Sequence, residues 1–180
     1  MTEQKNDVLL LAGKVLAFLM QVAMGIGGAA LIVAIAGLVL FHDEALAQIA
    51  AQTGDAEGFP IYLLIGVMLI GLGIVAALFV FFARLRQIID TVGAGDPFDP
   101  VNAERLNMMA WLMLAANLLF IPAAAIGVPL VDYFDAMEGA DVSIEQGIDL
   151  TGILLIIILF ILARVFRHGA AMRADLEGTV

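Results

Sequence analysis

The sequence of 180 residues holds few side chains of the types that carry catalysis or bind metals. It contains no cysteine and only two histidines, His42 and His168. We place these histidines at opposite ends of membrane-spanning helices, about 30 Å apart, so they cannot ligate one haem or metal ion together. No hydroxyl residue has a histidine placed to activate it, and no glycine loop followed by Lys-Ser or Lys-Thr is present to hold a phosphate. The sequence therefore predicts a protein that is not an enzyme and uses no cofactor and no metal.

Ionisable residues are also scarce where proton or ion pathways need them. The first three long apolar segments contain none in their interiors, and Gln21 and Asn117 are their strongly polar side chains. We interpret each as a group that hydrogen-bonds a neighbouring helix. A small transporter is disfavoured, because such proteins place ionisable groups inside their spans.

The fourth apolar segment is bounded by charges. Asp149 and Arg164 are 15 residues apart, or about 22 Å along a helix, which is shorter than a hydrocarbon core of about 30 Å. One of them must lie below the interface, unless the bilayer thins, and Arg164 can extend its long stem towards water. Alternatively, Arg164, Arg167 and His168 share one basic helix face that binds an anionic head group or an acidic protein group.

The composition places the chain in a membrane. It is 63% hydrophobic and 14% charged, with a mean hydropathy of +1.05 and a formal net charge of −10. Soluble domains are about 45–50% apolar and about 25% charged. These values exclude a disordered acidic protein, a disulfide-stapled secreted scaffold and a protein that binds nucleic acid directly through positive charge.

Four apolar segments are long enough, or nearly so, to cross a bilayer as helices. All eight Lys and Arg residues precede the first segment, lie between the second and third, or end and follow the fourth. By the positive-inside rule, both termini and the middle hairpin are cytoplasmic, in a bacterial inner membrane. We therefore predict one all-α domain, a four-helix transmembrane bundle. Its spans are 15–41, 60–83, 108–131 and 148–166, with a cytoplasmic hairpin at 84–107 and a cytoplasmic tail at 167–180.

Small residues suggest how the spans pack. Gly25/Ala29 and Gly73/Ala77 have the spacing that places two small residues on one helix face. We expect the first two spans to pack together through these faces; the alternative is a dimer seam. Pro122 and Pro129 predict a bent third span, and the segment 43–52 has the apolar spacing of a helix at the interface.

The hairpin is the most structured of the polar segments. The second span continues as a helix past Arg84, breaks at Gly93–Gly95, and Asp99 caps the next helix at Pro100. Because the hairpin and the tail emerge on one side, they could together bind a protein partner. The alternative is a rigid turn beside a frayed helix end. The candidate partner-binding residues are Asp96, Pro97, Phe98, Asn102, Arg105, Arg164, Arg167, His168, Glu177 and Val180.

Two stretches resemble a known family. Residues 94–106 read Ala-Gly-Asp-Pro-Phe-Asp-Pro-Val-Asn-Ala-Glu-Arg-Leu; residues 162–169 read Leu-Ala-Arg-Val-Phe-Arg-His-Gly, and Leu-Glu-Gly-Thr-Val ends the chain. Together they resemble a bacterial inner-membrane family known only as a domain of unknown function. The resemblance implies four spans and a genetic link to a small Xre-type helix-turn-helix regulator, whose gene often lies beside that of the member.

Our first hypothesis is therefore a non-enzymatic regulatory or sensory membrane protein that binds a cytoplasmic helix-turn-helix partner. The alternative is an accessory or structural subunit of a larger membrane complex, or a homo-oligomer, that offers its helix faces to other subunits and to the lipid bilayer. In a pull-down, recovery of a small DNA-binding protein would support the regulatory protein. Recovery of only large membrane subunits would contradict it and favour the accessory subunit.

Overall fold

The computed structural model describes residues 2–53, 60–135 and 149–177, and these residues form five helices. The helices are α1 (Thr2–Leu40), α2 (His42–Thr53), α3 (Ile61–Gly93), α4 (Pro100–Asp135) and α5 (Leu150–Glu177). Four of them are long and apolar enough to cross a membrane, over Val8–Leu40, Ile61–Gly93, Pro100–Val131 and Leu150–Leu176. The predicted all-α class is confirmed, each of the four predicted spans corresponds to one of these long apolar helices, and the helical spacing at 43–52 corresponds to α2.

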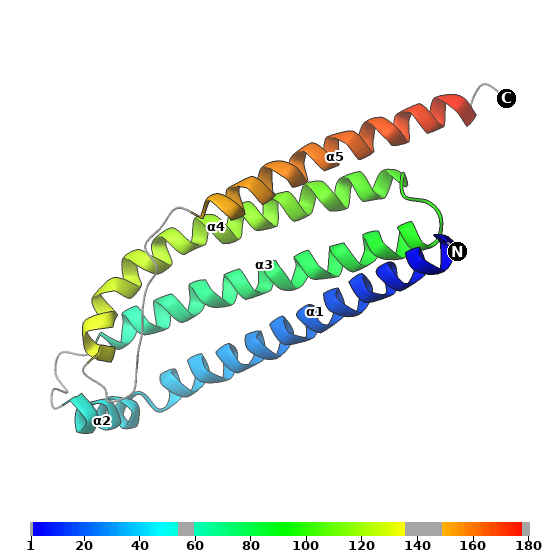
Figure 1. Cartoon of the computed structure of the whole chain (residues 1–180). Coiled ribbons are helices and arrows are strands. Elements are labelled where there is room, and N and C mark those ends of the chain that lie inside the picture. Colours follow the sequence, from blue (N-terminus) through cyan, green and yellow to red (C-terminus); the bar gives the residue numbers. More distant parts are fainter. Residues whose placement is uncertain (1, 54–59, 136–148, 178–180) are drawn as a thin grey trace.

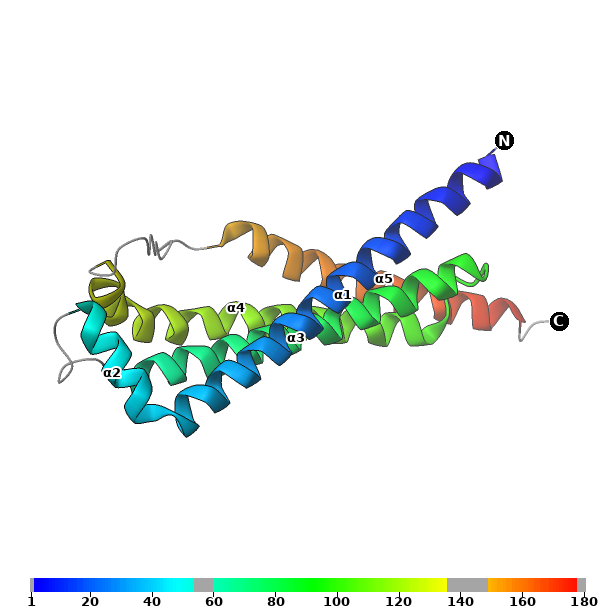
Figure 2. The same ribbon diagram turned by 90° about the horizontal axis from the view of Figure 1, so that it is seen from below.

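The four long helices lie side by side in the order α1, α3, α4, α5 (Figure 1). The extensive contacts join α1 to α3, α3 to α4, and α4 to α5. Seen from below, α1 crosses α3 obliquely and its first turns diverge from the other helices (Figure 2). The predicted four-helix bundle is thus an open row with α1 and α5 at its edges.

Both chain ends lie at the same end of this row. α1 begins and α5 ends at the same end of the row as the loop 94–99, which joins α3 to α4, while α2 lies at the opposite end (Figures 1 and 2). We call these the hairpin end and the α2 end. The structure agrees with the predicted number of crossings, because an even number returns the chain to the end at which it began.

The glycines of α1 pack on α3 as predicted. A Cβ atom added at Gly25 would lie 3.5 Å from the ring of Phe79, and one at Gly28 would lie 3.5 Å from Val75. Gly73, however, faces Leu119 of α4 at the same distance, so the expectation that it packs on the first span is wrong. The reason is that α3 lies between two helices, and Gly73 is on its α4 side.

The prolines of α4 do not interrupt it. Pro122 and Pro129 both lie inside the helix, whose last turns curve away from the line of its first half (Figure 1). This is the bent helix that the prolines predicted, since each one removes a backbone donor from the helix.

α5 is displaced along α4 towards the hairpin end. Its Phe160 ring packs edge-on against Trp111, with 5.5 Å between centroids, and Leu159 and Ala163 share a buried cluster with Met109 and Leu106. At its start, a Cβ at Gly152 would lie only 2.8 Å from Nδ2 of Asn117, a residue half-way along α4. α5 therefore begins beside the middle of α4 and covers only the half that is nearer the hairpin.

Candidate functional site

The loop between α3 and α4 is built from a glycine turn and an aspartate cap. Gly95 has φ +85°, a left-handed conformation that glycine adopts without steric cost, and its N–H donates to the carbonyl of Val92 at 3.1 Å. Four residues later, Oδ1 of Asp99 accepts the N–H of Val101 at 2.9 Å. The predicted break near Gly95 and the predicted cap at Asp99 are both confirmed.

Asn102 joins the loop to both helices. It is fully buried, and its Oδ1 accepts hydrogen bonds from Oγ1 of Thr91 at 3.0 Å and from Nη1 of Arg105 at 2.9 Å. Its Nδ2 donates to the carbonyl of Pro97 at 3.1 Å. A buried amide is tolerated only when it is hydrogen-bonded, and here the three bonds hold α3, the loop and α4 in one geometry.

Arg105 extends this network across the helix pair. Its Nη1 also donates to the carbonyl of Gln87 in α3 at 3.3 Å, and its side chain is half-buried. Within the described residues, therefore, Asn102 and Arg105 stabilise the hairpin through these hydrogen bonds. A protein partner would contact a surface whose shape the two residues determine. Thr91 could not be identified as their partner from the sequence, because it lies 11 residues before Asn102 on another helix.

An aromatic contact joins the loop to α5. The ring of Phe98 lies 5.6 Å from that of Phe166, centroid to centroid, and a Cβ added at Gly169 would lie 2.7 Å from Cδ1 of Phe98. Real Cβ atoms do not approach so closely, so Gly169 leaves the space that Phe98 occupies. Phe98 is nevertheless 42% exposed.

An ion pair completes this junction. Nη1 of Arg173 lies 2.5 Å from Oδ1 of Asp96, with both side chains about half exposed. We call the Phe98–Phe166–Gly169 contact and the Asp96–Arg173 pair the clasp. The structure thus brings together the two segments that the sequence singled out, and Phe166, Gly169 and Arg173 are the members that sequence reasoning missed.

The hairpin and α5 contain the two stretches of sequence that resembled a known family. A model of a family described as "Protein of unknown function (DUF2975)" matches residues 47–180. The chain belongs to the DUF2975 family. The match includes the hairpin and α5, and confirms the resemblance stated from these two stretches. No curated protein and no solved structure matches the chain.

In this DUF2975 protein, the remaining candidate residues lie on or beyond α5. Arg164, Arg167 and His168 are exposed, whereas Ala163 and Ala170 of the same helix are buried. Glu177 is the last residue of α5, but its side chain lies outside the described part, and Val180 lies outside it altogether. The basic residues predicted to share a face by their spacing are therefore all exposed on α5.

Basic residues of all four long helices lie at one level. Nζ of Lys14 is 2.6 Å from Oδ1 of Asp90, and the Arg86 guanidinium lies over the ring of Phe18 at 5.7 Å. Arg105 reaches the carbonyl of Gln87 on the same stretch of α3, and Ala163 shares a buried cluster with Ile88. We call this level the basic belt; its members are Lys14, Arg84, Arg86, Arg105 and Arg164.

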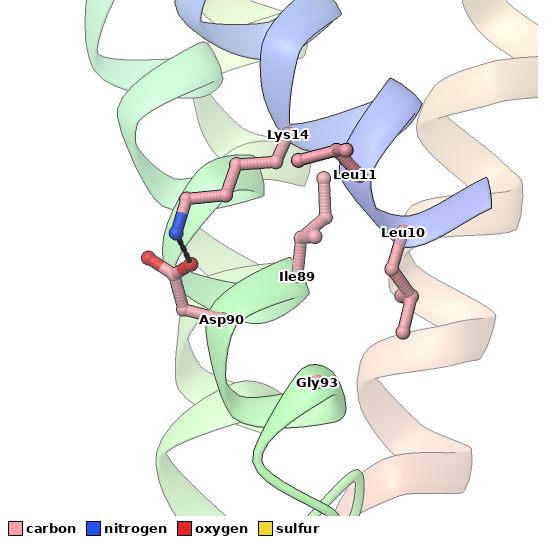
Figure 3. Close-up of a pocket in the computed structure, with 6 residues that line it drawn as sticks. All are labelled: Leu10, Leu11, Lys14, Ile89, Asp90 and Gly93. Carbon is pink, nitrogen blue, oxygen red and sulfur yellow. Dashed lines mark ion pairs between the residues drawn. The ribbon is translucent and has the colours of Figure 1, made fainter. Parts of the chain in front are cut away.

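A shallow pocket opens at the belt between α1 and α3 (Figure 3). It has a volume of about 290 Å³ and contains the Lys14–Asp90 pair. Its lining residues are Leu10, Leu11, Lys14, Ile89, Asp90 and Gly93. Because the cation and the carboxylate already neutralise each other, the pocket holds no uncompensated charge for a ligand.

The polar residues inside the spans behave differently from expectation. Nδ2 of Asn117 lies 3.5 Å from the carbonyl of Met113 in its own helix, and Oε1 of Gln21 is buried with no hydrogen-bond partner among the described residues. The predicted bonds from these groups to other helices are therefore wrong. For Asn117, the carbonyl one turn earlier is within reach of the side chain and competes with any partner on another helix.

Asp149 caps α5 beside the middle of α4. Its Oδ1 accepts the N–H of Gly152 at 2.8 Å, and a Cβ at Gly152 would overlap its carboxylate. Since the same Cβ would lie 2.8 Å from Nδ2 of Asn117, Asp149 is beside the apolar middle of α4. Of the two charges that bound the fourth segment, Asp149 is therefore the one beside the middle of α4, whereas Arg164 lies at the basic belt.

Proposed function

We propose that this DUF2975 protein is a non-enzymatic regulatory or sensory protein of the bacterial inner membrane that docks a cytoplasmic protein at its hairpin end. The orientation rests on the positive-inside rule, because the basic belt and both chain ends lie at the hairpin end. A small helix-turn-helix regulator is the partner that the family resemblance implies.

The observation that carries this proposal is apolar surface left exposed beyond the basic belt. Phe98 of the loop is 42% exposed and Met172 of α5 is 52% exposed. Inside a bilayer such residues would face lipid, but beyond the belt they face water or a protein, and exposed apolar patches of this kind mark interaction sites. The clasp holds these two segments together, so that they offer one surface.

A pull-down with the full-length chain in mild detergent tests the proposal. We expect a small DNA-binding protein to be recovered, and the single variant Met172→Glu to lower its recovery about tenfold or more, because one charge in the centre of an apolar contact removes a dominant residue. Gln48→Glu adds the same charge at the α2 end and is the matched control. Equal recovery by both variants, or recovery of large membrane subunits alone, would contradict the proposal.

The orientation has its own test. The chain contains no cysteine, so Ala94→Cys and Gln48→Cys each provide one thiol, both at exposed positions. In sealed right-side-out vesicles, a membrane-impermeant maleimide should label Gln48→Cys and leave Ala94→Cys unlabelled. The opposite pattern would place the hairpin outside and overturn the docking proposal.

The open row favours a second candidate, an accessory subunit or a homo-oligomer. Among the described side chains of α1, only Ala17 is buried, and an apolar groove of about 360 Å³ lies between α1 and α3 beside Gly25, Gly28 and Leu72. Close approach of another helix at small residues stabilises association in membranes. Crosslinking through Ala29→Cys, an exposed position that lines the groove, would detect a second helix there in native membranes.

A further inference from the structure

The docking surface proposed at Phe98 and Met172 does not include the exposed basic face of α5. We propose that Arg164, Arg167 and His168 form a binding site for the head group of an anionic phospholipid, with one acyl chain along the neighbouring apolar stripe of α5. This inference goes beyond the docking of a protein partner and does not depend on it.

The first step is that these three residues are available, whereas their neighbours are engaged. Lys14 is paired with Asp90, and Arg173 with Asp96. Arg84 donates to Oε1 of Gln87, Arg86 lies over Phe18, and Arg105 donates to Asn102. Arg164, Arg167 and His168, in contrast, form no hydrogen bond or ion pair with the described part of the chain, and all three are exposed.

The second step is their geometry. Residues three and four apart on a helix are neighbours, with about 5–6 Å between their Cβ atoms. Two guanidinium groups and an imidazole at this spacing can converge on one phosphate, and guanidinium matches the phosphate oxygens with paired hydrogen bonds. The spacing therefore suits a single phosphate-bearing group better than a dispersed cloud of counterions.

The third step is what lies along the same stripe of α5. Ile157 and Ile161 precede Arg164 at spacings of seven and three, and are 49% and 56% exposed. They continue the exposed side of the helix into the membrane-spanning section, while Arg164 lies at the basic belt. A phospholipid offers both halves of this pattern, an acyl chain for the isoleucines and an anionic head group for the arginines. An acidic group on a soluble protein offers only the second.

The fourth step is that the orientation of this face is set by the clasp. Phe166 and Gly169 contact Phe98, and Ala163 and Ala170 are buried against the rest of the chain. These contacts lie on one side of α5 and prevent the helix from turning its basic side inwards. The helix face is therefore oriented before a lipid arrives, and only the exposed side chains have to be ordered on binding.

The test uses the full-length chain in mild detergent and native mass spectrometry with added phosphatidylglycerol or phosphatidylcholine. Wild-type protein should bind phosphatidylglycerol about tenfold or more tightly than phosphatidylcholine, since each basic residue near an anionic surface adds to the attraction. Arg164→Gln with Arg167→Gln should abolish this preference. The matched control, Arg84→Gln with Arg86→Gln, removes the same charge at the belt and should keep it.

Four results would overturn the proposal. One is an unchanged lipid preference in the Arg164/Arg167 variant, and another is an equal loss in both double variants, which would indicate bulk charge alone. The third is displacement of the lipid by inorganic phosphate at matched concentration, which would indicate a site for a soluble anion. The fourth is displacement by a partner protein that needs Arg164 and Arg167, which would assign the face to protein docking.

Replacement by lysine separates the effect of positive charge from that of guanidinium geometry. Arg164→Lys with Arg167→Lys keeps both charges but loses the planar fork, and should retain part of the preference for phosphatidylglycerol. The Arg164/Arg167 glutamine variant should keep the wild-type helical content by circular dichroism, because both substituted side chains are exposed. A failure in this assay leaves the effect of Met172→Glu in the pull-down unchanged, so the two proposals fail separately.

Discussion

The hairpin end and the α2 end of this molecule are held together in different ways. At the hairpin end, three helices contribute to one buried cluster of Ile88, Leu106, Met109, Ala110, Leu159 and Ala163, beside the Asn102 network and the clasp. At the α2 end, the corresponding cluster has, within the described residues, only Ile61 and Leu130 as buried members. Among the described residues, the chain is therefore more extensively packed and hydrogen-bonded at the hairpin end than at the α2 end.

The difference between the two ends follows from whether polar side chains lie near water or apolar side chains lie in hydrocarbon. Polar side chains near water can be desolvated and paired to stabilise one geometry, as Asn102 is. In hydrocarbon, apolar surface gains nothing by moving from lipid to protein, so helices separate unless close packing holds them. Four substitutions should test the difference between the two ends. The free energy of unfolding of each variant is measured by reversible unfolding in mixed detergent micelles, and the largest expected loss comes first.

The largest effect is expected from Asn102→Ala. Removal of this amide leaves Thr91, the Pro97 carbonyl and Arg105 without a shared partner in a buried place. The loss should be about 3 kcal/mol. Asn117→Ala is the matched control, and should cost less than about 1 kcal/mol, because its hydrogen bond of 3.5 Å lies within its own helix. Equal losses would remove the contrast between the hairpin and the span.

The next effect is expected from Gly169→Ala. The added methyl group would lie 2.7 Å from the Phe98 ring and push it from Phe166. We expect a loss of about 1–2 kcal/mol, as is usual for overpacking. Gly27→Ala, with no atom within 4 Å of its Cβ, should instead raise stability by about 0.5 kcal/mol through helix propensity. A stabilising Gly169→Ala would show that Phe98 does not occupy that space.

A smaller effect is expected at the start of α5. Asp149→Ala removes the carboxylate that accepts the Gly152 N–H at 2.8 Å, and should cost about 1 kcal/mol, the usual contribution of a helix cap. Asp149→Asn keeps an accepting oxygen and should cost only a few tenths of that. If both substitutions cost the same, the charge of Asp149 matters more than its cap.

The smallest effect is expected from Asp96→Asn. The Asp96–Arg173 pair is half exposed, and such pairs contribute about 0.5 kcal/mol, less in high salt. The loss should therefore disappear at about 1 M salt, where screening is nearly complete. A loss that persists in high salt would show that Asp96 acts through packing in the clasp and not through charge.

Much of the local structure was predictable. Apolar length identified the four spanning helices, the Asp-Pro pair at Asp99 identified the start of α4, and the glycines before it identified the turn. These features depend on interactions between residues close in the sequence. Their physical causes, namely helix length in a bilayer, cap hydrogen bonds and the conformational freedom of glycine, can be read without a partner helix.

The contacts between distant segments were not predictable in the same way. The sequence did not indicate that Gly169 leaves room for Phe98, that Gly73 faces α4, or that α5 begins beside Asn117. Lys14 and Asp90 lie 76 residues apart, and only the packing of α1 on α3 brings them together. Each of these facts concerns which helix is the neighbour and at what level it packs.

The amino-acid sequence by itself therefore determined the helices, their number and the side on which the positive charges gather. Only the tertiary structure decided the order α1, α3, α4, α5, the displacement of α5 and the joining of hairpin and tail through the clasp. The physical reason is that the lipid-facing and helix-facing sides of a membrane helix are both apolar. Without a polar side to mark the surface, periodicity cannot tell which face meets a neighbour, and close packing alone makes that choice.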